Sequence, residues 1–296
     1  RTVDSGSGQR IQGRGVSGEN EGTFQDDGGT LDVNNLTGNL GDAIATNGGT
    51  LDVDGNYTND RDHNITNGST FILRGNWNND GIRNFDVTDG SRLALVDRWT
   101  NTGTINVINS TFDWYGIGTG DTVGTGVNDG VLNVTDSTVN LNSTVSLDDL
   151  GTFNRSGNST VNINGTYENA GTTLDLDAAT TWNLTGGRIN GGVIAGDATL
   201  QVTDDSTLDG VTLNADAFMD SDQSNSQYLT VLNGLTLNGT LTMQRVHSHD
   251  RENVLRFVGT QALQGDGEIV FVDPGQHYSS ERYNTIQSTG AGTLMI

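Results

Sequence analysis

Cysteine is absent from this chain of 296 residues, and proline, lysine and aromatic residues are scarce or missing. Without cysteine, neither a disulfide bond nor a thiolate metal site can hold the fold together. All 14 basic residues are arginine, and Pro274 is the single proline. Only 32% of the residues are hydrophobic and 6% aromatic, which is too little for a large compact core. The composition leaves a disordered chain or a repeat protein in which each turn buries a thin strip.

Positive charge is also in short supply, because 14 basic residues face 37 acidic ones for a net charge of −23. Such a surface repels nucleic acid and anionic membranes, so we expect neither as a partner. No apolar run is long enough to cross a bilayer as a helix, so we expect no membrane insertion. The acidic, well-solvated composition predicts an extracellular or cell-surface location.

Glycine, asparagine, threonine and aspartate are abundant, and they form a repeating phrase. A turn residue precedes Gly or Ser, then usually Thr, then two apolar residues separated by one position, as in Gly48-Gly49-Thr50-Leu51-Asp52-Val53. The spacing clusters near 20 to 22 residues, which is typical of a solenoid, and one double-length interval after Asp197 fits two turns. The phrase begins at Gly28, Gly48, Gly68, Gly90, Asn109, Asp136, Asn158, Ala179, Asp197, Asn238, Asp266 and Ala291.

The alternation of apolar and polar residues in each phrase predicts a short strand with one buried face. Hairpins would explain one such strand but not the long-range phasing. We therefore predict an all-β fold, a single right-handed parallel β-helix of roughly 13 coils with about 20 to 22 residues in each. It should occupy residues 28–296, after an irregular N-terminal segment, residues 1–27, that serves as a linker, cap or docking strand.

Two interior columns follow from this register. The first contains Leu31, Leu51, Phe71, Leu93, Phe112, Val139, Val161 and Trp182, and the second contains Val33, Val53, Leu73, Leu95, Trp114, Leu141, Ile163 and Leu184.

A second phrase follows in four coils, where an aromatic residue is followed two positions later by Asn. It occurs at Tyr57, Trp77, Trp99 and Tyr167. The first three rings should stack at one corner. Their partners Asn59, Asn79 and Asn101 should align beside them, as left-handed corners or as a hydrogen-bonded ladder.

The stretches NGGTLDVDGNYTN, DRWTNTGTINVINST and NSTVNINGTYENAGTTLDLD resemble the β-strand repeats of large bacterial surface proteins. These include autotransporter passenger domains and filamentous-haemagglutinin-like exoproteins. The resemblance covers most of residues 28–296. It implies secretion, a right-handed β-helix and an adhesive or structural role, and it supplies no catalytic residues.

Adjacent carboxylates are the first candidates for chemistry, because glycosidic cleavage needs two carboxyl groups at a defined separation. Such pairs occur at Asp26-Asp27, Asp148-Asp149 and Asp204-Asp205. In a chain with this many aspartates they also arise by chance, and the motifs of the polygalacturonase-like enzymes are absent. We predict that no residue is catalytic.

Metal ligands are densest at His247-Ser248-His249-Asp250, where both histidines would share one face of a strand. Arg245 and Arg251 flank them, which favours a solvated loop. Gly118-Thr119-Gly120-Asp121 is only a fragment of a calcium-binding nonapeptide. We therefore expect no cofactor and no dedicated metal site, with only weak calcium binding open. The two long interruptions, Tyr115 to Val127 and Arg245 to Asn253, are candidate recognition loops.

The phrase at Ala291 is expected to begin a fresh coil, which would leave Leu294, Ile296 and a row of backbone groups unpaired. We therefore expect the chain to continue beyond Ile296 or another copy to dock there. The predicted function is a structural or adhesive rod segment, with other copies or cell-surface glycans as partners. Two alternatives stay open: a self-stacking subunit of an extracellular filament, and a polysaccharide-degrading β-helix enzyme or phage tailspike. Two or three carboxylates with a basic partner on one face of consecutive coils would favour the enzyme.

Overall fold

The computed structural model describes residues 2–5, 9–17, 22–116, 126–221, 226–245, 252–272 and 284–296. Within these ranges, only the backbone is described at residues 2–5, 9–17, 221 and 245. The fold is all-β, with 66% strand and 1% helix. Its strands wind into parallel stacked coils that form a β-solenoid, as the repeat predicts. The chain divides into two compact units, residues 1–160 and 161–296.

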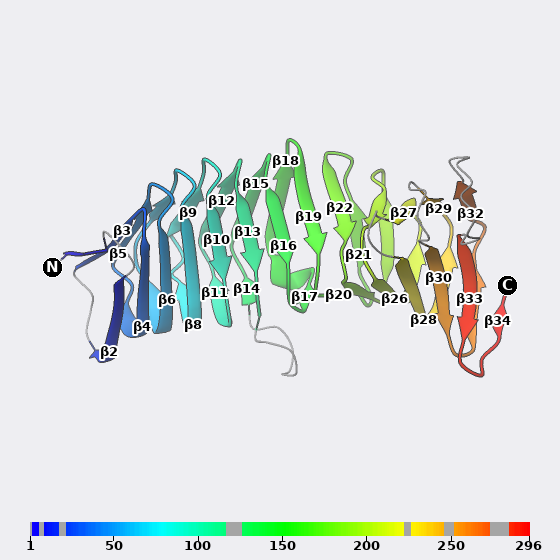
Figure 1. Ribbon diagram of the computed structural model, residues 1–296, viewed down its shortest axis with the longest axis horizontal. Helices are drawn as coiled ribbons and strands as arrows, with labels where there is room; N and C mark the ends of the chain where they lie inside the picture. Colours follow the sequence, from blue (N-terminus) through cyan, green and yellow to red (C-terminus); the bar gives the residue numbers. More distant parts are fainter. Residues whose placement is uncertain are drawn as a thin grey trace. The chain divides into compact units, whose positions relative to one another are not determined.

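In the first unit, consecutive turns place their strands side by side along common ladders (Figure 1). One ladder runs β2-β4-β6-β8-β10-β13-β16, a second runs β7-β9-β12-β15-β18, and a third runs β1-β3-β5. The elements are β1 (Thr2–Ser5), β2 (Gln9–Ser17), β3 (Thr23–Asp27), β4 (Thr30–Asn39), β5 (Asp42–Thr46), β6 (Thr50–Asn59), β7 (His63–Ile65), β8 (Thr70–Asn79), β9 (Asn84–Val87), β10 (Arg92–Leu95), β11 (Arg98–Asn101), β12 (Thr104–Ile108), β13 (Thr111–Trp114), β14 (Gly126–Asn128), β15 (Val131–Thr135), β16 (Thr138–Leu141), β17 (Val145–Ser146), the 3-10 helix η1 (Asp148–Leu150) and β18 (Thr152–Ser156).

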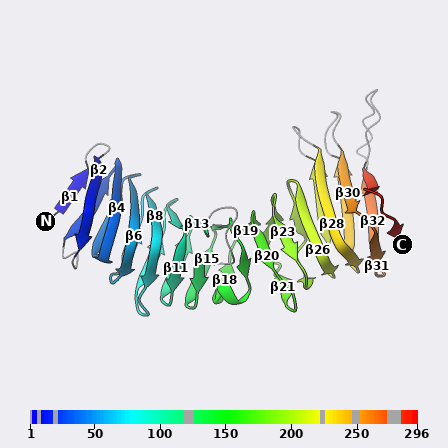
Figure 2. The same ribbon diagram turned by 90° about the horizontal axis from the view of Figure 1, so that it is seen from below.

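The second unit repeats this arrangement with two main ladders, which Figure 2 shows from a second direction. One runs β22-β25-β27-β29-β32, and the other runs β20-β23-β26-β28-β30-β33. The elements are β19 (Ser159–Ile163), which begins in the first unit, β20 (Thr166–Glu168), β21 (Thr173–Leu176), β22 (Thr180–Leu184), β23 (Arg188–Asn190), β24 (Val193–Gly196), β25 (Leu200–Val202), β26 (Ser206–Leu213), β27 (Ala217–Ser221), β28 (Gln227–Leu237), β29 (Thr240–Arg245), β30 (Asn253–Val258), β31 (Gln261–Gln264), β32 (Glu268–Val272), β33 (Thr285–Thr289) and β34 (Leu294–Met295).

Both predicted interior columns are buried, because the repeat places the same apolar positions in the same phase of every turn. In the first unit, Leu51 is in register with Phe71 and Val53 with Leu73. The same register continues through β10 and β13 to Val139 and Leu141. All 16 predicted members are at most 3% exposed. Burying an aliphatic or aromatic side chain of this size stabilises the fold by about 1.5–3 kcal/mol relative to its exposure.

The double-length interval after Asp197 contains an extra turn, as predicted. Its strand β27 lies between β25 and β29, with Ala217 in register with Leu200 and Leu241. Met219 is likewise in register with Val202.

The corners of the first unit use left-handed backbone at the residue before the phrase or at the first residue of the phrase. Asn47, Asn67, Asp89, Asn109 and Asp136 all have positive φ, which Asn and Asp tolerate better than other side chains. Asn59, Asn79 and Asn101 are not among the residues with positive φ, so of their two expected roles the left-handed corner is wrong.

The last phrase does not begin a fresh coil, which corrects the expectation for Ala291 to Ile296. Leu294 is in register with Gln261 on β31, whereas a new coil would have paired it with β32. The local pattern of Gly, Thr and Leu marks a strand, but it does not determine which ladder the strand joins. The phrase at Ala291 therefore does not count as a turn of the solenoid.

Parallel pairing also includes residues on the N-terminal side of Gly28. The strand β2 pairs with β4, with a register shift between Gln12 and Val16. The ladder thus contains part of the segment that we expected to be irregular, while the boundary at residue 28 and the segment's role stay predictions.

Candidate functional site

The three candidate acid pairs contain side chains that accept hydrogen bonds within their own turn or from the next turn. Asp26 is buried and its Oδ2 accepts from Gly29 N at 3.2 Å, whereas the neighbouring Asp27 is exposed and accepts from Asn47 Nδ2 at 2.6 Å. Consecutive residues of a strand point to opposite faces, so this pair does not present two carboxylates to one substrate.

The other two pairs also stabilise turns. Asp149 Oδ2 accepts from both Ser146 N, at 2.8 Å, and Ser146 Oγ, at 2.6 Å, at the start of η1. Asp204 Oδ1 accepts from Asp205 N at 2.8 Å, and Asp205 Oδ1 accepts from Tyr228 N at 2.9 Å.

The His247-Ser248-His249-Asp250 cluster and the Gly118-Thr119-Gly120-Asp121 fragment lie outside the described residues, as does most of both candidate recognition loops. Over the part of the chain that the structure describes, no three or more His, Cys, Asp or Glu side chains come together to hold a metal ion.

The predicted aromatic column is confirmed in the first unit. Tyr57 and Trp77 stack with ring centroids 6.2 Å apart and Trp77 and Trp99 with centroids 6.1 Å apart, at interplanar angles of 6° and 17°. All three rings are at most 3% exposed, so the column is interior and cannot serve as a ligand platform. It ends at Gly126, which pairs with Trp99. Tyr167 is equally buried but lies on β20, in register with Ile189.

A hydrogen-bonded ladder of asparagine amides lies beside this column, which confirms the second of the two roles expected for these residues. Asn59 Nδ2 donates to Asn79 Oδ1 at 2.7 Å, Asn79 Nδ2 to Asn101 Oδ1 at 2.6 Å, and Asn101 Nδ2 to Asn128 Oδ1 at 2.6 Å. Asn128 Nδ2 then donates to the carbonyl of Leu150 at 2.8 Å. Because all four amides are buried and paired, the ladder fixes the register of the turns without an unsatisfied amide.

His63 lies at the first end of this ladder. Its Nε2 is 2.7 Å from Asn59 Oδ1 and its Nδ1 is 3.1 Å from the carbonyl oxygen of Ala43. Burial lowers the pKa of His63 from 6.5 to about 4, against the opposing influence of the Ala43 carbonyl and of Asp42, Asp60 and Asp62. The neutral ring therefore belongs to the core of the first unit.

The outward face of β8, β10 and β13 departs from the repeat. In the outward column that contains Asp52, the next two turns carry Ile72 and Ala94, and Asp113 follows. Arg92 also replaces the threonine of the phrase, since it is in register with Thr70 and Thr111. None of these changes affects the buried columns, so the core does not require them.

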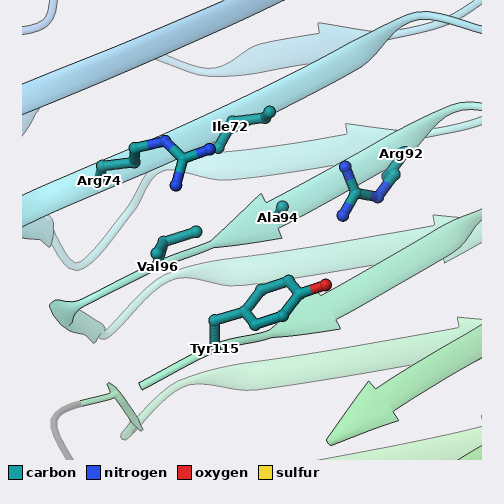
Figure 3. Close-up of a pocket in the computed structure, with 6 residues that line it drawn as sticks. All are labelled: Ile72, Arg74, Arg92, Ala94, Val96 and Tyr115. Atoms are coloured by element: carbon teal, nitrogen blue, oxygen red, sulfur yellow. The ribbon is translucent and has the colours of Figure 1, made fainter. Parts of the chain in front are cut away.

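These substitutions create a shallow depression of about 160 Å³, lined by Ile72, Arg74, Arg92, Ala94, Val96 and Tyr115 (Figure 3). The two guanidinium groups lie on opposite sides of Ala94, and the ring of Tyr115 borders the depression (Figure 3). We call this the arginine depression. Its apolar floor and cationic rim contrast with a chain whose net charge is −23.

Each arginine of the depression is held by an aspartate outside it. Arg74 Nε donates to Asp52 Oδ1 at 2.8 Å and to Oδ2 at 3.1 Å, and this bond raises the pKa of Arg74 above its usual value. Arg92 Nε donates to Asp113, whose other oxygen accepts from Asn140 Nδ2 at 2.6 Å. Both anchoring bonds use Nε, so the Nη atoms make no hydrogen bond to the described residues.

Two carboxylates and two basic partners thus lie on one face of consecutive coils, which is the arrangement we said would favour an enzyme. However, Asp52 and Asp113 lie on β6 and β13, with β8 and β10 between them. Three interstrand steps separate them by about 14 Å, whereas glycosidases place their carboxyl groups about 5–9.5 Å apart. Asp52 and Asp113 are therefore too far apart to act together as a glycosidase pair.

Sequence reasoning did not identify the arginine depression, although one signal was present. Arg92 occupies a position at which the neighbouring phrases have Thr, and Ile72 and Ala94 replace polar residues. In a repeat protein, the core does not constrain the outward positions. Residues that depart from the repeat at these positions therefore indicate candidate sites.

Comparison with family models, curated proteins and solved structures finds no match to this chain. In the described residues, no helix is long and apolar enough to span a membrane. The function must therefore be argued from the fold and from the surfaces described above.

Proposed function

We propose that this chain is a non-catalytic structural or adhesive segment of a large extracellular or cell-surface protein, in which stacked β-coils form a stiff support. The observation that carries the proposal is the continuity of the ladders and buried columns within each unit. From β4 to β16, every turn of the first unit pairs in parallel with the next and contributes the same two core positions. Bending such a stack would break backbone hydrogen bonds and would also separate side chains that pack in the core.

The acidic surface supports an extracellular setting. The absence of cysteine is compatible with it, because the ladders of the solenoid hold the turns together without disulfide bonds. The resemblance of the repeats to bacterial surface proteins supports the same setting. The non-catalytic part of the proposal is supported by the wide separation of Asp52 from Asp113 and by the acid pairs, of which Asp26, Asp149, Asp204 and Asp205 accept from main-chain amides.

The filament alternative is favoured by one observation on the second unit. Among the described strands, β32 pairs only with β29 and β33 only with β30, so each has one unpaired edge. Phe271, Ile286 and Met295 on these last strands are 51%, 37% and 56% exposed. Another turn, from a continuing chain or from a second copy, would cover these apolar groups and pair with the strand edges.

The test combines mechanics with a search for turnover. In single-molecule pulling of the chain, a stiff support should resist force until turns detach one after another. Incubation with a panel of neutral and acidic polysaccharides should release no new reducing ends or unsaturated products. Collapse at low force would overturn the structural role, and turnover that disappears on replacing Asp52 or Asp113 by Asn would overturn the non-catalytic role. Sedimentation over a range of concentrations tests the filament, which requires association that Phe271→Ser weakens.

A further inference from the structure

We propose that the arginine depression is a binding site for a carboxylate-bearing sugar, such as one uronate residue of an acidic glycan. This site goes beyond the proposed support role, because the ladders and columns are complete whether or not the depression is occupied. The proposal begins with the side chains of the rim. Arg74 and Arg92 each keep their Nη groups available, and hydrogen bonds from guanidinium to carboxylate are stronger than those between neutral groups.

The two anchoring aspartates preorganise this rim. Asp113 is 4% exposed at its side chain and also accepts from Asn140, so it fixes the position of Arg92. Asp52 fixes Arg74 from the opposite side through both of its carboxylate oxygens. Because the anchors occupy Nε, each arginine loses little further conformational freedom when a ligand binds to its Nη atoms.

The floor indicates the rest of the ligand. Ile72 and Val96 are partly exposed and form an apolar surface beside the buried Ala94, and Tyr115 provides an aromatic ring with a hydroxyl at its end. A sugar ring has apolar C–H faces that pack on such groups, while a small inorganic anion would leave the floor uncovered. The volume of about 160 Å³ is smaller than the usual ~300–1,000 Å³ of small-molecule pockets, so the depression fits one sugar ring of a longer chain.

The chain's overall negative charge opposes an anion only weakly at this range. At physiological ionic strength the screening length is about 8 Å, so carboxylates far from the rim are largely screened. The nearby carboxylates are Asp52 and Asp113, which pair with the arginines, and Asp54 and Asp97, which lie close to Arg74. The Nη donors of the rim favour a carboxylate over a neutral sugar, because a charged acceptor forms the stronger hydrogen bond with a guanidinium.

The experiment compares methyl β-D-glucuronide with methyl β-D-glucoside, which differ only in the carboxylate at C6. Binding is measured by saturation-transfer NMR and by titration calorimetry on the full chain. We expect saturable binding of the glucuronide at least about tenfold tighter than that of the glucoside, since bonds to charged groups contribute about 1.5–3 kcal/mol. Arg92→Thr, which restores the residue of the repeat, should weaken glucuronide binding about tenfold or more.

Arg188→Thr provides a matched control. Arg188 pairs with Asp209 in the second unit as Arg92 pairs with Asp113, and both aspartates are nearly buried. The control thus removes the same charge and leaves the same kind of unpaired carboxylate, but lies far along the sequence from the depression. It should keep full glucuronide affinity.

Failure of the parent to bind glucuronide at millimolar concentration would overturn the proposal. Equal binding of the glucoside, or equal weakening by Arg92→Thr and Arg188→Thr, would overturn it as well. The structural role is tested by pulling and not by ligand binding, so failure of one proposal is distinguishable from failure of the other.

Discussion

Replacing Trp77 by Ala should strongly destabilise the first unit. The indole ring is 3% exposed, lies between Tyr57 and Trp99 in the stack, and meets Phe85 edge-on with centroids 6.4 Å apart. Truncation of a buried Trp to Ala costs about 3–5 kcal/mol in lost transfer and cavity formation. The two stacked neighbours place Trp77→Ala toward the upper end, because each aromatic pair adds about 0.5–1.5 kcal/mol beyond burial.

The assay is urea unfolding followed by far-UV circular dichroism, which does not depend on the fluorescence of the deleted ring. Asn78→Ala, on the same strand but facing outward and exposed, is the control and should change stability by less than about 0.5 kcal/mol. Trp77→Phe should cost less than Trp77→Ala, because it keeps a ring and removes an indole Nε1 that has no hydrogen-bond partner among the described residues. A loss below about 1 kcal/mol for Trp77→Ala would refute an interior stack.

Three further predictions concern the same unit. Asn101→Ala interrupts the buried ladder and should cost about 1–3 kcal/mol for each amide left unsatisfied. Asn106→Ala, in the half-buried outward ladder, should cost less because water replaces the lost bond. Equal losses of unfolding free energy in urea would contradict this distinction. Gly126→Ala places a Cβ about 2.5 Å from Trp99 Cε2 and should destabilise the fold by about 1–3 kcal/mol. The melting temperature should fall, and an unchanged melting temperature would show that the Trp99 ring does not pack against Gly126. The pKa of His63 is about 4 in the folded state and 6.5 in the unfolded state, so between these pH values the unfolded state binds the extra proton. The free energy of unfolding should therefore fall as the pH drops from 6.5 toward 4, by up to about 3 kcal/mol. Comparison with His63→Gln isolates this contribution, and parallel pH profiles of the two proteins would exclude it.

The sequence predicted the interior well because a strand's period of two leaves little freedom there. Leu51 and Val53 must face inward together, and the recurrence of the same phrase at Phe71 and Leu73 determines which residues become neighbours. The prediction failed for the last phrase, because the same short pattern fits strands of either ladder. Leu294 has the local pattern of a new turn, but its strand pairs with β31.

The arginine depression could not be derived from periodicity, because outward positions are not constrained by the core. Arg92 and Ala94 were visible as departures from the repeat, but their proximity to Arg74 and Tyr115 depends on the stacking of three turns. The roles of buried polar residues were similarly ambiguous. The sequence allowed Asn79 to be a left-handed corner or a ladder amide, and only the backbone conformation and the hydrogen bonds distinguish them.

Disulfide cross-linking tests the central claim that successive phrases begin successive parallel turns. The chain contains no cysteine, so introduced pairs report without background. Thr50 is in register with Thr70, and Thr58 with Asn78, across β6 and β8. Parallel neighbours about 4.8 Å apart lie within the range that a disulfide bridges. The account predicts that Thr50→Cys with Thr70→Cys, and Thr58→Cys with Asn78→Cys, both oxidise readily in the folded chain. Cross-linking of Thr50→Cys with Asn78→Cys in their place would show an antiparallel hairpin and contradict the solenoid.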